Sequence, residues 1–419
     1  MPQPVELIIK NADQLLTLAT ATPDNPLGII TQGSVAIGRD QVVWVGAEAN
    51  LAKEVLVTES TRVLDAQGKV VIPGLIDAHT HLIFAGSRAD EFDLRNIGIS
   101  YQEIMGRGGG ILATVAATRK ASKEELYRLG VRRLNRALRW GTTTLEVKSG
   151  YGLSLEHELK MLDVIKELSA HHPVDLIPTF LGAHAIPEEY KGQREKYIQL
   201  ICQEMIPSIA ERKLAIFCDV FCEKGAFTYD ETEQILRTGI KYGLKAKVHA
   251  DEFSNSGGAI LAADLGAVSA DHLLSAPAEA LAAMRLRGVA AVLLPGTSFV
   301  LGLKRYGPAR SILAQGLTLA LATDFNPGSC FTQSLPLIMS IACTQMHMTV
   351  AEAVLACTSG SAKALALPDK YGKLAPGSPA DLLILDITDY RFLAYQMGEN
   401  PVETVIKEGR IVIENRHLV

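Results

Sequence analysis

Short apolar runs alternate with longer amphipathic segments through the middle of the chain. The runs have the length of buried strands, and the segments between them have the apolar spacing of helices. The first run begins at residue 70, and the others cover residues 142–148, 175–181, 217–222, 245–249, 267–272, 289–294 and 318–324. Eight strand–helix units in a row favour an α/β fold of the (β/α)8 TIM type over a doubly wound sheet.

Local signals support three of the helices and one loop. Ser122 and Glu125 form a capping-box pattern that starts a helix running to about residue 140, and two further helices are expected over 156–169 and 228–242. The glycine-rich segment 106–110 is too flexible for a helix. A phosphate-binding role for it is not favoured, because no Gly-Lys-Ser/Thr follows.

The two ends of the chain have a different pattern, with short strands and turn clusters over residues 6–64, 380–386 and 405–413. Neither end has enough strands for its own core, since an isolated hairpin is marginal in water. We therefore expect the ends to pair into a small discontinuous β-sandwich domain. Its two parts would be residues 1–65 and 371–419, and the barrel domain would be residues 66–370.

Composition narrows the class of protein. The 419 residues are 48% hydrophobic but only 6% aromatic, as in α/β enzymes with a buried parallel sheet. The net charge of −5 includes no basic run, so neither nucleic acid nor an anionic membrane is expected as a partner. No apolar stretch is long enough to span a membrane, and the first residues lack the pattern of a secretory signal.

Cysteine usage points to a reducing, cytoplasmic location, because the six cysteines form no CxxC pair or disulfide framework. Cys218 and Cys222 are candidate metal ligands, but a free cysteine is more often a small buried apolar residue.

The first run ends in His-Thr-His. A strand has a side-chain period of two, so His79 and His81 would point to the same face at its end. Neutral imidazole is the commonest protein ligand for transition metals, so the pair can hold one ion from one side. The alternative is that two histidines lie together by chance or cap the strand.

Other titratable residues also fall at predicted strand ends. These are Glu146, Lys148, His184, His249, His272 and Asp324. The carboxyl ends of barrel strands converge where active sites lie. His79, His81, His249 and Asp324 then form a plausible metal site with room for water. Taken singly, His249 has the alternative of a core histidine, and Asp324 that of an N-cap before Asn326.

Such a metal would activate water at neutral pH, and a hydrolase also needs a base and a proton donor. Glu252 follows His249 closely enough to reach over the site, His272 is placed to polarise a carbonyl, and Asp324 can take a proton as well as ligate. The alternatives are a solvated loop carboxylate for Glu252 and a structural histidine for His272.

Six segments together carry a family resemblance: residues 74–81, 84–88, 146–152, 180–184, 249–253 and 324–329. The chain resembles the amidohydrolase superfamily and, more narrowly, the imidazolonepropionase family of histidine degradation. That resemblance implies hydrolysis of the ring amide of 4-imidazolone-5-propanoate to N-formimidoyl-L-glutamate. It also implies a homodimer.

The resemblance assigns roles around the substrate. Arg88 would bind the propionate bidentately, and the alternative is a surface arginine that pairs with Asp90 or Glu91. Tyr151 and His184 would hold the ring or the carboxylate, and the family pattern makes Glu252 a residue that binds substrate and handles protons. Three residues after the last strand would add hydrogen-bond donors: Asn326, Gly328 and Ser329.

Binuclear relatives use a carboxylated lysine at the end of a barrel strand. Here Lys224 lies outside the inward position after the strand at 217–222, so one metal ion is favoured, with zinc as the default and iron as the alternative. The nearest rival function is a mononuclear aminohydrolase that deaminates a cytosine- or guanine-like ring. A non-catalytic binding barrel is a second rival, and it would have lost at least one of the four ligands.

Overall fold

The computed structural model describes residues 3–99, 103 and 108–419. Two residues of the predicted glycine-rich loop, Gly106 and Arg107, lie outside the described residues. The chain divides into an end unit (Met1–Asp77, Asn135–Thr144 and Ser334–Val419) and a central unit (Ala78–Leu134 and Leu145–Gln333). The domain boundaries at residues 65 and 370 stay a prediction.

Eight strands form one sheet in chain order, which confirms the predicted (β/α)8 architecture. The strands are β10 (Leu75–Asp77), β11 (Thr142–Lys148), β12 (Asp175–Ala183), β13 (Phe217–Cys222), β14 (Lys245–Ala250), β15 (Ser269–His272), β16 (Ala290–Leu293) and β17 (Leu319–Leu321). Neighbouring strands are parallel, with Cys218 opposite Ala246 and His249 opposite Asp271 in the registers. Almost every side chain on these strands is buried, because helices cover the outside and the interior is filled.

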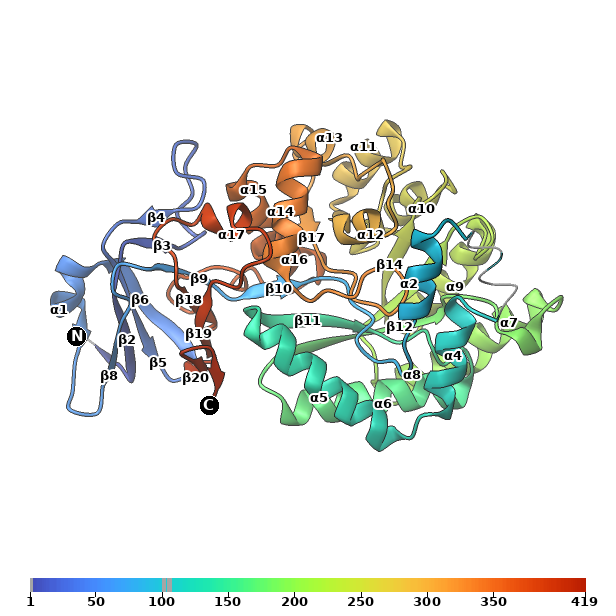
Figure 1. Ribbon diagram of the computed structural model, residues 1–419, viewed down its shortest axis with the longest axis horizontal. Helices are drawn as coiled ribbons and strands as arrows, with labels where there is room; N and C mark the ends of the chain where they lie inside the picture. The colour runs from blue at the N-terminus through green and yellow to red at the C-terminus, as the bar shows by residue number, and fades with distance from the viewer. Residues whose placement is uncertain (1–2, 100–102, 104–107) are drawn as a thin grey trace. The chain divides into compact units, whose positions relative to one another are not determined.

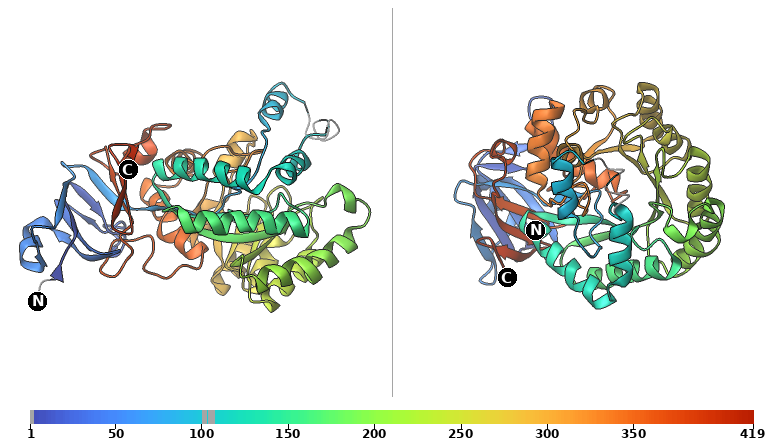
Figure 2. Two further views of the ribbon diagram at one scale, coloured as in Figure 1. Left: turned by 90° about the horizontal axis from the view of Figure 1, so that it is seen from below. Right: turned by 45° about the vertical axis from the view of Figure 1, so that its right-hand side comes forward.

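Helices follow the strands, and the right panel of Figure 2 shows the green and yellow ones outside the sheet. In and next to the central unit they are α2 (Ala89–Asn96), α4 (Ile111–Lys120), α5 (Lys123–Arg139), α6 (Leu155–His171), η2 (Glu188–Tyr190), α7 (Arg194–Leu200), the π-helical turn η3 (Ile201–Met205), α8 (Ile206–Glu211), α9 (Tyr229–Lys241), α10 (Gly258–Leu265), α11 (Ala278–Arg287), α12 (Pro295–Val300) and α13 (Ala309–Ala314). The end unit contains η1 (Glu48–Asn50), α1 (Leu51–Glu54), α14 (Leu335–Met346), α15 (Val350–Ala356), α16 (Ser359–Ala364) and α17 (Phe392–Tyr395).

The predicted helix starts are present. The Glu125 backbone N–H donates to Ser122 Oγ at 3.1 Å before α5. Thr228 and Glu231 form a complete capping box at α9. Each cap satisfies backbone donors that the first helical turn leaves without a partner, so these short polar signals fix where the helices begin.

The end unit contains sheets from the chain ends, and one of them combines strands of both ends, as predicted (Figure 1). A four-stranded sheet has the order β6 (Gln41–Ala47), β5 (Gly33–Gly38), β2 (Leu7–Ala12), β8 (Arg62–Asp65). A seven-stranded sheet has the order β21 (His417–Leu418), β20 (Arg410–Glu414), β19 (Val402–Lys407), β18 (Leu382–Leu385), β9 (Val70–Pro73), β3 (Gln14–Leu16), β4 (Ile29–Ile30). Two short strands, β1 (Gln3–Pro4) and β7 (Val55–Leu56), pair separately. Residues from both sheets, including Val35, Val71 and Leu382, share one buried core.

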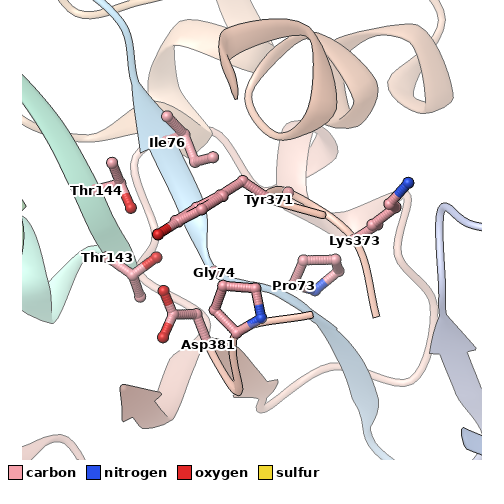
Figure 3. A pocket seen from close by; sticks show the side chains of 10 residues that line it. Pro73, Gly74, Ile76, Thr143, Thr144, Tyr371, Lys373 and Asp381 are labelled. Atoms are coloured by element: carbon pink, nitrogen blue, oxygen red, sulfur yellow. The ribbon is translucent and has the colours of Figure 1, made fainter. Parts of the chain in front are cut away.

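The apolar run at 70–77 is two strands rather than the single barrel strand we expected. β9 pairs antiparallel with β18, whereas β10 joins the barrel, and the break falls at Gly74. A Cβ on Gly74 would lie 2.2 Å from Thr143 Oγ1, so only glycine allows this approach. Figure 3 shows Thr143, Thr144 and Tyr371 around the following strand. The cavity there is about 10 Å³, which is room for about one water and too little for a substrate.

No helix among the residues that the structure describes is long and apolar enough to cross a membrane.

Candidate metal centre

His79 and His81 lie just past β10, which ends at Asp77, so the prediction that they end the strand is wrong in detail. Their backbone is held by the segment that follows β17. The Asp324 N–H donates to the His79 carbonyl at 3.0 Å, and the His81 N–H donates to the Phe325 carbonyl at 2.9 Å. Two segments far apart in sequence are thereby fixed side by side, and each presents candidate ligands.

Four imidazole rings gather at this point. The His79 ring centroid is 5.3 Å from that of His81, 4.5 Å from that of His249 and 5.6 Å from that of His272. Asp324 Oδ1 lies 3.6 Å from His79 Nε2 and 3.5 Å from His81 Nε2. Potential ligand atoms converge in three sets that share His79. The partners of His79 are His249 and His272 in one set, His81 and Asp324 in another, and Glu146 and Asp271 in the third.

The donor set fits a metal ion. His79 Nε2 and His249 Nε2 are buried and have no hydrogen-bond partner, which is costly unless something else binds them. Burial lowers the pKa of both His79 and His81 well below the usual range, and neighbouring cationic groups lower it further. His79 and His81 are therefore neutral, the state in which an imidazole ligates. The cluster is a metal-binding centre.

Two buried aspartates lie against ring nitrogens of two of the histidines. Asp271 Oδ2 is 2.6 Å from His79 Nδ1, and Asp219 Oδ2 is 2.9 Å from His249 Nδ1. The hydrogen bond with Asp271 fixes the tautomer of His79 and leaves its Nε2 for a metal. His249 Nδ1 lies close to Asp219 but is not aligned for a hydrogen bond with it. Neither aspartate was among the residues predicted for the site. Their signal was a charged residue inside an otherwise apolar barrel strand, where a carboxylate needs a partner.

Lys148 and Lys247 belong to a group of fully buried charged side chains close to the histidine rings. Lys148 Nζ is 2.9 Å from Glu146 Oε1 and 2.7 Å from Asp219 Oδ2, while Lys247 Nζ is 3.1 Å from Glu146 Oε2. Burial lowers the pKa of Lys148, but Asp219, Glu146 and Asp271 outweigh burial and raise it. Both lysine side chains are completely inaccessible to solvent.

Burial raises the pKa of Asp324 to about 6, although hydrogen bonds from Thr297 and Asn326 act in the other direction. The Thr297 hydroxyl donates to Asp324 Oδ2 at 2.5 Å. Asp324 also has a positive φ of 51°, a conformation that non-glycine residues adopt rarely and mostly where the surrounding structure demands it.

Glu252 lies on a loop built around two other carboxylates. Glu223 accepts the backbone N–H groups of Phe253 and Ser254, and Asp251 accepts those of Ser256, Gly258 and Ala259. Glu252 Oε1 is thereby placed 3.5 Å from His272 Nδ1. Burial, followed by Asp324 and Glu223, raises the pKa of Glu252 well above its usual range.

Arg88 has the ion pair that we named as its alternative. Its Nε donates to Glu91 Oε2 at 2.9 Å, and its side chain is only 10% exposed. A Cβ on Gly328 would lie 2.2 Å from Arg88 Nη1, so the loop after β17 passes directly over the guanidinium. The structure thus places Arg88 against the segment that contains Asp324.

Tyr151 and His184 lie beside the histidine cluster. The Tyr151 ring centroid is 5.8 Å from that of His81, and the His184 ring stacks on His81 at 5.0 Å. The Tyr151 loop is fixed by buried Glu158, which accepts the backbone N–H groups of Gly150, Gly152 and Leu153. Glu158 was not predicted as a site residue, because its position on α6 is that of an ordinary helical glutamate.

The loop after Asp324 is closed on itself. Asn326 Oδ1 accepts the backbone N–H groups of Gly328 and Ser329, and Asn326 Nδ2 donates to the Asp324 carbonyl. Donors that we expected to face a substrate are therefore bound within the loop in this structure.

Comparison with known proteins agrees with this centre. The model of the amidohydrolase family matches residues 70–412. An imidazolonepropionase from Geobacillus thermodenitrificans (strain NG80-2) is 51% identical over 97% of this chain and 98% of its own length. One from Geobacillus sp. (strain WCH70) is 48% identical over 98% and 99%, and one from Alkaliphilus oremlandii (strain OhILAs) is 45% identical over 99% and 100%.

Solved structures share the fold. A zinc-bound adenosine deaminase from Xanthomonas campestris has a TM-score of 0.76 at 18% identity, covering 100% of this chain and 95% of that one. A triazine hydrolase variant has a TM-score of 0.74 at 16% identity, covering 99% and 96%. At these identities the likeness shows architecture alone, so the deaminase alternative gains nothing from it. The near-complete match to curated relatives goes further: the chain belongs to the amidohydrolase family and, within it, to the imidazolonepropionases, which are hydrolases.

Proposed function

We propose that the chain hydrolyses the ring amide of 4-imidazolone-5-propanoate to N-formimidoyl-L-glutamate, a step of histidine degradation. The observation that carries this proposal is the similarity to imidazolonepropionases along almost the whole chain, at 45–51% identity for the three relatives described. The small-molecule substrate follows from the same relatives.

The ligands that we propose are His79, His81, His249 and Asp324, holding one divalent ion. The orphaned Nε2 atoms of His79 and His249 support this set, as does Asp324 Oδ1 within 3.6 Å of two of the imidazoles. Zinc suits a His/Asp site, and iron is the alternative because both metals accept these donors. Such an ion supplies Lewis-acid polarisation and activates water at neutral pH.

Proton handling falls to Glu252, His272 and Asp324. The hydrolysis must protonate the leaving ring nitrogen, and the raised pKa of Glu252 favours a form that carries a proton. His272 Nδ1 is within 3.5 Å of Glu252, so the two can share or pass a proton, and His272 can polarise the carbonyl. Asp324 faces the imidazoles through Oδ1, and its second carboxylate oxygen, Oδ2, can accept a proton.

Substrate binding is assigned to side chains around this centre. Arg88 would hold the propionate, since a guanidinium binds a carboxylate in two parallel hydrogen bonds. Its pairing with Glu91 supports the role, because it fixes Arg88 in one orientation. Tyr151 and His184 would contact the ring, and Glu252, Asn326, Gly328 and Ser329 would complete the contacts once substrate opens the loop.

The test of this assignment is product identification. Purified protein should convert freshly generated 4-imidazolone-5-propanoate to N-formimidoyl-L-glutamate and leave aminated pyrimidine and purine rings unchanged. Ammonia release from such a ring without imidazolone turnover would replace the proposal with an aminohydrolase.

We also propose a cellular compartment and an oligomeric state for the protein. The six cysteines are all free in the described residues, which supports a reducing compartment such as the cytoplasm. A homodimer is proposed by analogy with the family, and light scattering of the purified protein tests it.

A further inference from the structure

The third of the three sets of potential ligands, called the lower set here, joins His79 to two carboxylates. One nitrogen of His79 and one oxygen each of Glu146 and Asp271 lie within 4.8 Å of one another, all completely buried. By geometry alone this set has the size of a metal site. Its two carboxylates are donors that divalent ions accept, whereas His79 Nδ1 is bound to the Asp271 carboxylate at 2.6 Å.

The ammonium groups of Lys148 and Lys247 both lie close to the two carboxylates of this set. Lys148 Nζ lies 2.9 Å from Glu146 Oε1 and 3.7 Å from Asp271 Oδ2. Lys247 Nζ lies 3.1 Å from Glu146 Oε2 and 3.8 Å from Asp271 Oδ2. Both carboxylates therefore have cations on them already. Neither lysine is exposed, so neither can leave without bringing its charge through the packed barrel.

Buried carboxylates outnumber the buried ammonium groups around the centre. Three of them, Glu146, Asp219 and Asp271, lie within 3.8 Å of Lys148 or Lys247. Asp324 and Glu252 are further buried carboxylates, beside the histidines. Two neighbouring carboxylates, Glu223 and Asp251, are compensated separately by the backbone N–H groups of their own loop.

Lys148 also connects this lower set to the proposed ligands. Its Nζ contacts Asp219, which lies 2.9 Å from His249, and Asp271, which lies 2.6 Å from His79. Lys247 is held in place by the Ala78 carbonyl at 3.2 Å and lies 5.4 Å from the centre of the Phe217 ring. Both ammonium groups are thus fixed parts of the barrel interior.

We propose that Lys148 and Lys247 act as built-in cations in place of a second metal ion, and so limit the centre to one ion. This inference rests on the single-ion part of the proposed function and is independent of the substrate. Removing one ammonium should leave Glu146 and Asp271 undercompensated and open the lower set to a divalent ion.

The test counts metal per chain in the full-length protein. Wild type, Lys148→Met and Lys247→Met are loaded with excess Co²⁺, freed of unbound ion, and assayed by elemental analysis and by the magnetic coupling that two adjacent Co²⁺ ions show. We expect one ion in the wild type and a second in each single variant.

Two controls separate this effect from a general loss of a buried lysine. The double variant Lys148→Met/Glu146→Gln removes one charge of each sign, so it should return to one ion. Lys407→Met removes a buried lysine that pairs with Asp381 at 2.8 Å in the end unit, and it should leave the count unchanged.

A lost buried cation destabilises a fold strongly, so melting temperature is measured as well. If a single variant is unstable, added Co²⁺ should raise its melting temperature more than that of the wild type, because the ion replaces the missing charge. Folded single variants that keep one ion would overturn the inference, as would unstable ones that excess Co²⁺ does not rescue. A failure of imidazolone turnover, in contrast, would count against the proposed substrate only.

Discussion

His79 Nδ1 lies 2.6 Å from Asp271 Oδ2, and both side chains are completely buried. The short contact leaves His79 with one orientation and one tautomer, in which Nδ1–H donates to the carboxylate and Nε2 faces Asp324 at 3.6 Å. The ligand atoms are thus arranged before an ion arrives, by residues that do not touch the ion themselves.

Asp271→Asn should therefore weaken metal binding. An amide keeps the size of the side chain but loses the charge that stabilises the Nδ1–H. Outer partners of this kind are typically worth about 10- to 100-fold in metal affinity. Chelator competition measures the change. Asp163→Asn, which removes a surface partner of Arg212, is the matched control and should bind metal as tightly as the wild type. Equal affinities in all three proteins would remove Asp271 from this role.

Asp324→Asn should abolish turnover while the fold survives. The substitution removes a proposed ligand and a proton acceptor but keeps the volume, and acid–base groups alone contribute about 10²- to 10⁴-fold to rate. Steady-state kinetics measure the loss of turnover, and a melting curve tests whether the fold survives. A variant with wild-type kcat would exclude both proposed roles of Asp324.

Gly328→Ala should weaken substrate binding through Arg88. The new methyl would lie 2.2 Å from Arg88 Nη1, so the guanidinium must move. Charge-assisted hydrogen bonds contribute about 1.5–3 kcal/mol, so we expect KM to rise by about tenfold or more. Arg88→Ala should raise KM by a similar factor.

The double variant Gly328→Ala/Arg88→Ala distinguishes this mechanism from a general disturbance of the loop. If both substitutions act through the guanidinium, the second adds little to the first. Additive increases in KM would show that the glycine acts by another route, and an unchanged KM in Arg88→Ala would remove Arg88 from the propionate contact.

His172 should make stability depend on pH away from the metal centre. Burial lowers its pKa from 6.5 to about 4, so between these values the unfolded chain binds a proton that the folded chain does not. Its contribution to stability is complete above pH 6.5 and is lost as pH falls towards 4. His172→Asn should reduce the loss of urea stability between pH 7 and pH 5, and an identical loss in both proteins would contradict this.

The sequence predicts the barrel well because its signals are local. Apolar runs such as 217–222 and 245–249 coincide with β13 and all but the last residue of β14, and the start of α5 follows from the Ser122 cap. The prediction of one strand over residues 70–77 is wrong because the chain divides there into two strands. The division depends on the close approach of Gly74 to Thr143, which is far away in the sequence.

The sequence predicts those residues of the candidate site that lie at or just after the ends of strands. His79, His81, His249 and Asp324 follow from their positions after apolar runs. The residues behind them do not, because a carboxylate such as Asp271 or Glu158 acquires its role only from the partner that folding brings to it. The loop closure by Asn326 is likewise a matter of geometry, since its side chain could equally face a substrate.

The most direct measurement is turnover of freshly generated 4-imidazolone-5-propanoate before chelation, after chelation and after metal is added back. We expect imidazolone absorbance to fall with formation of N-formimidoyl-L-glutamate, the activity to disappear with the metal, and the activity to return with one divalent ion per chain. Full turnover by metal-free protein, or none by folded and metal-loaded protein, would contradict the account.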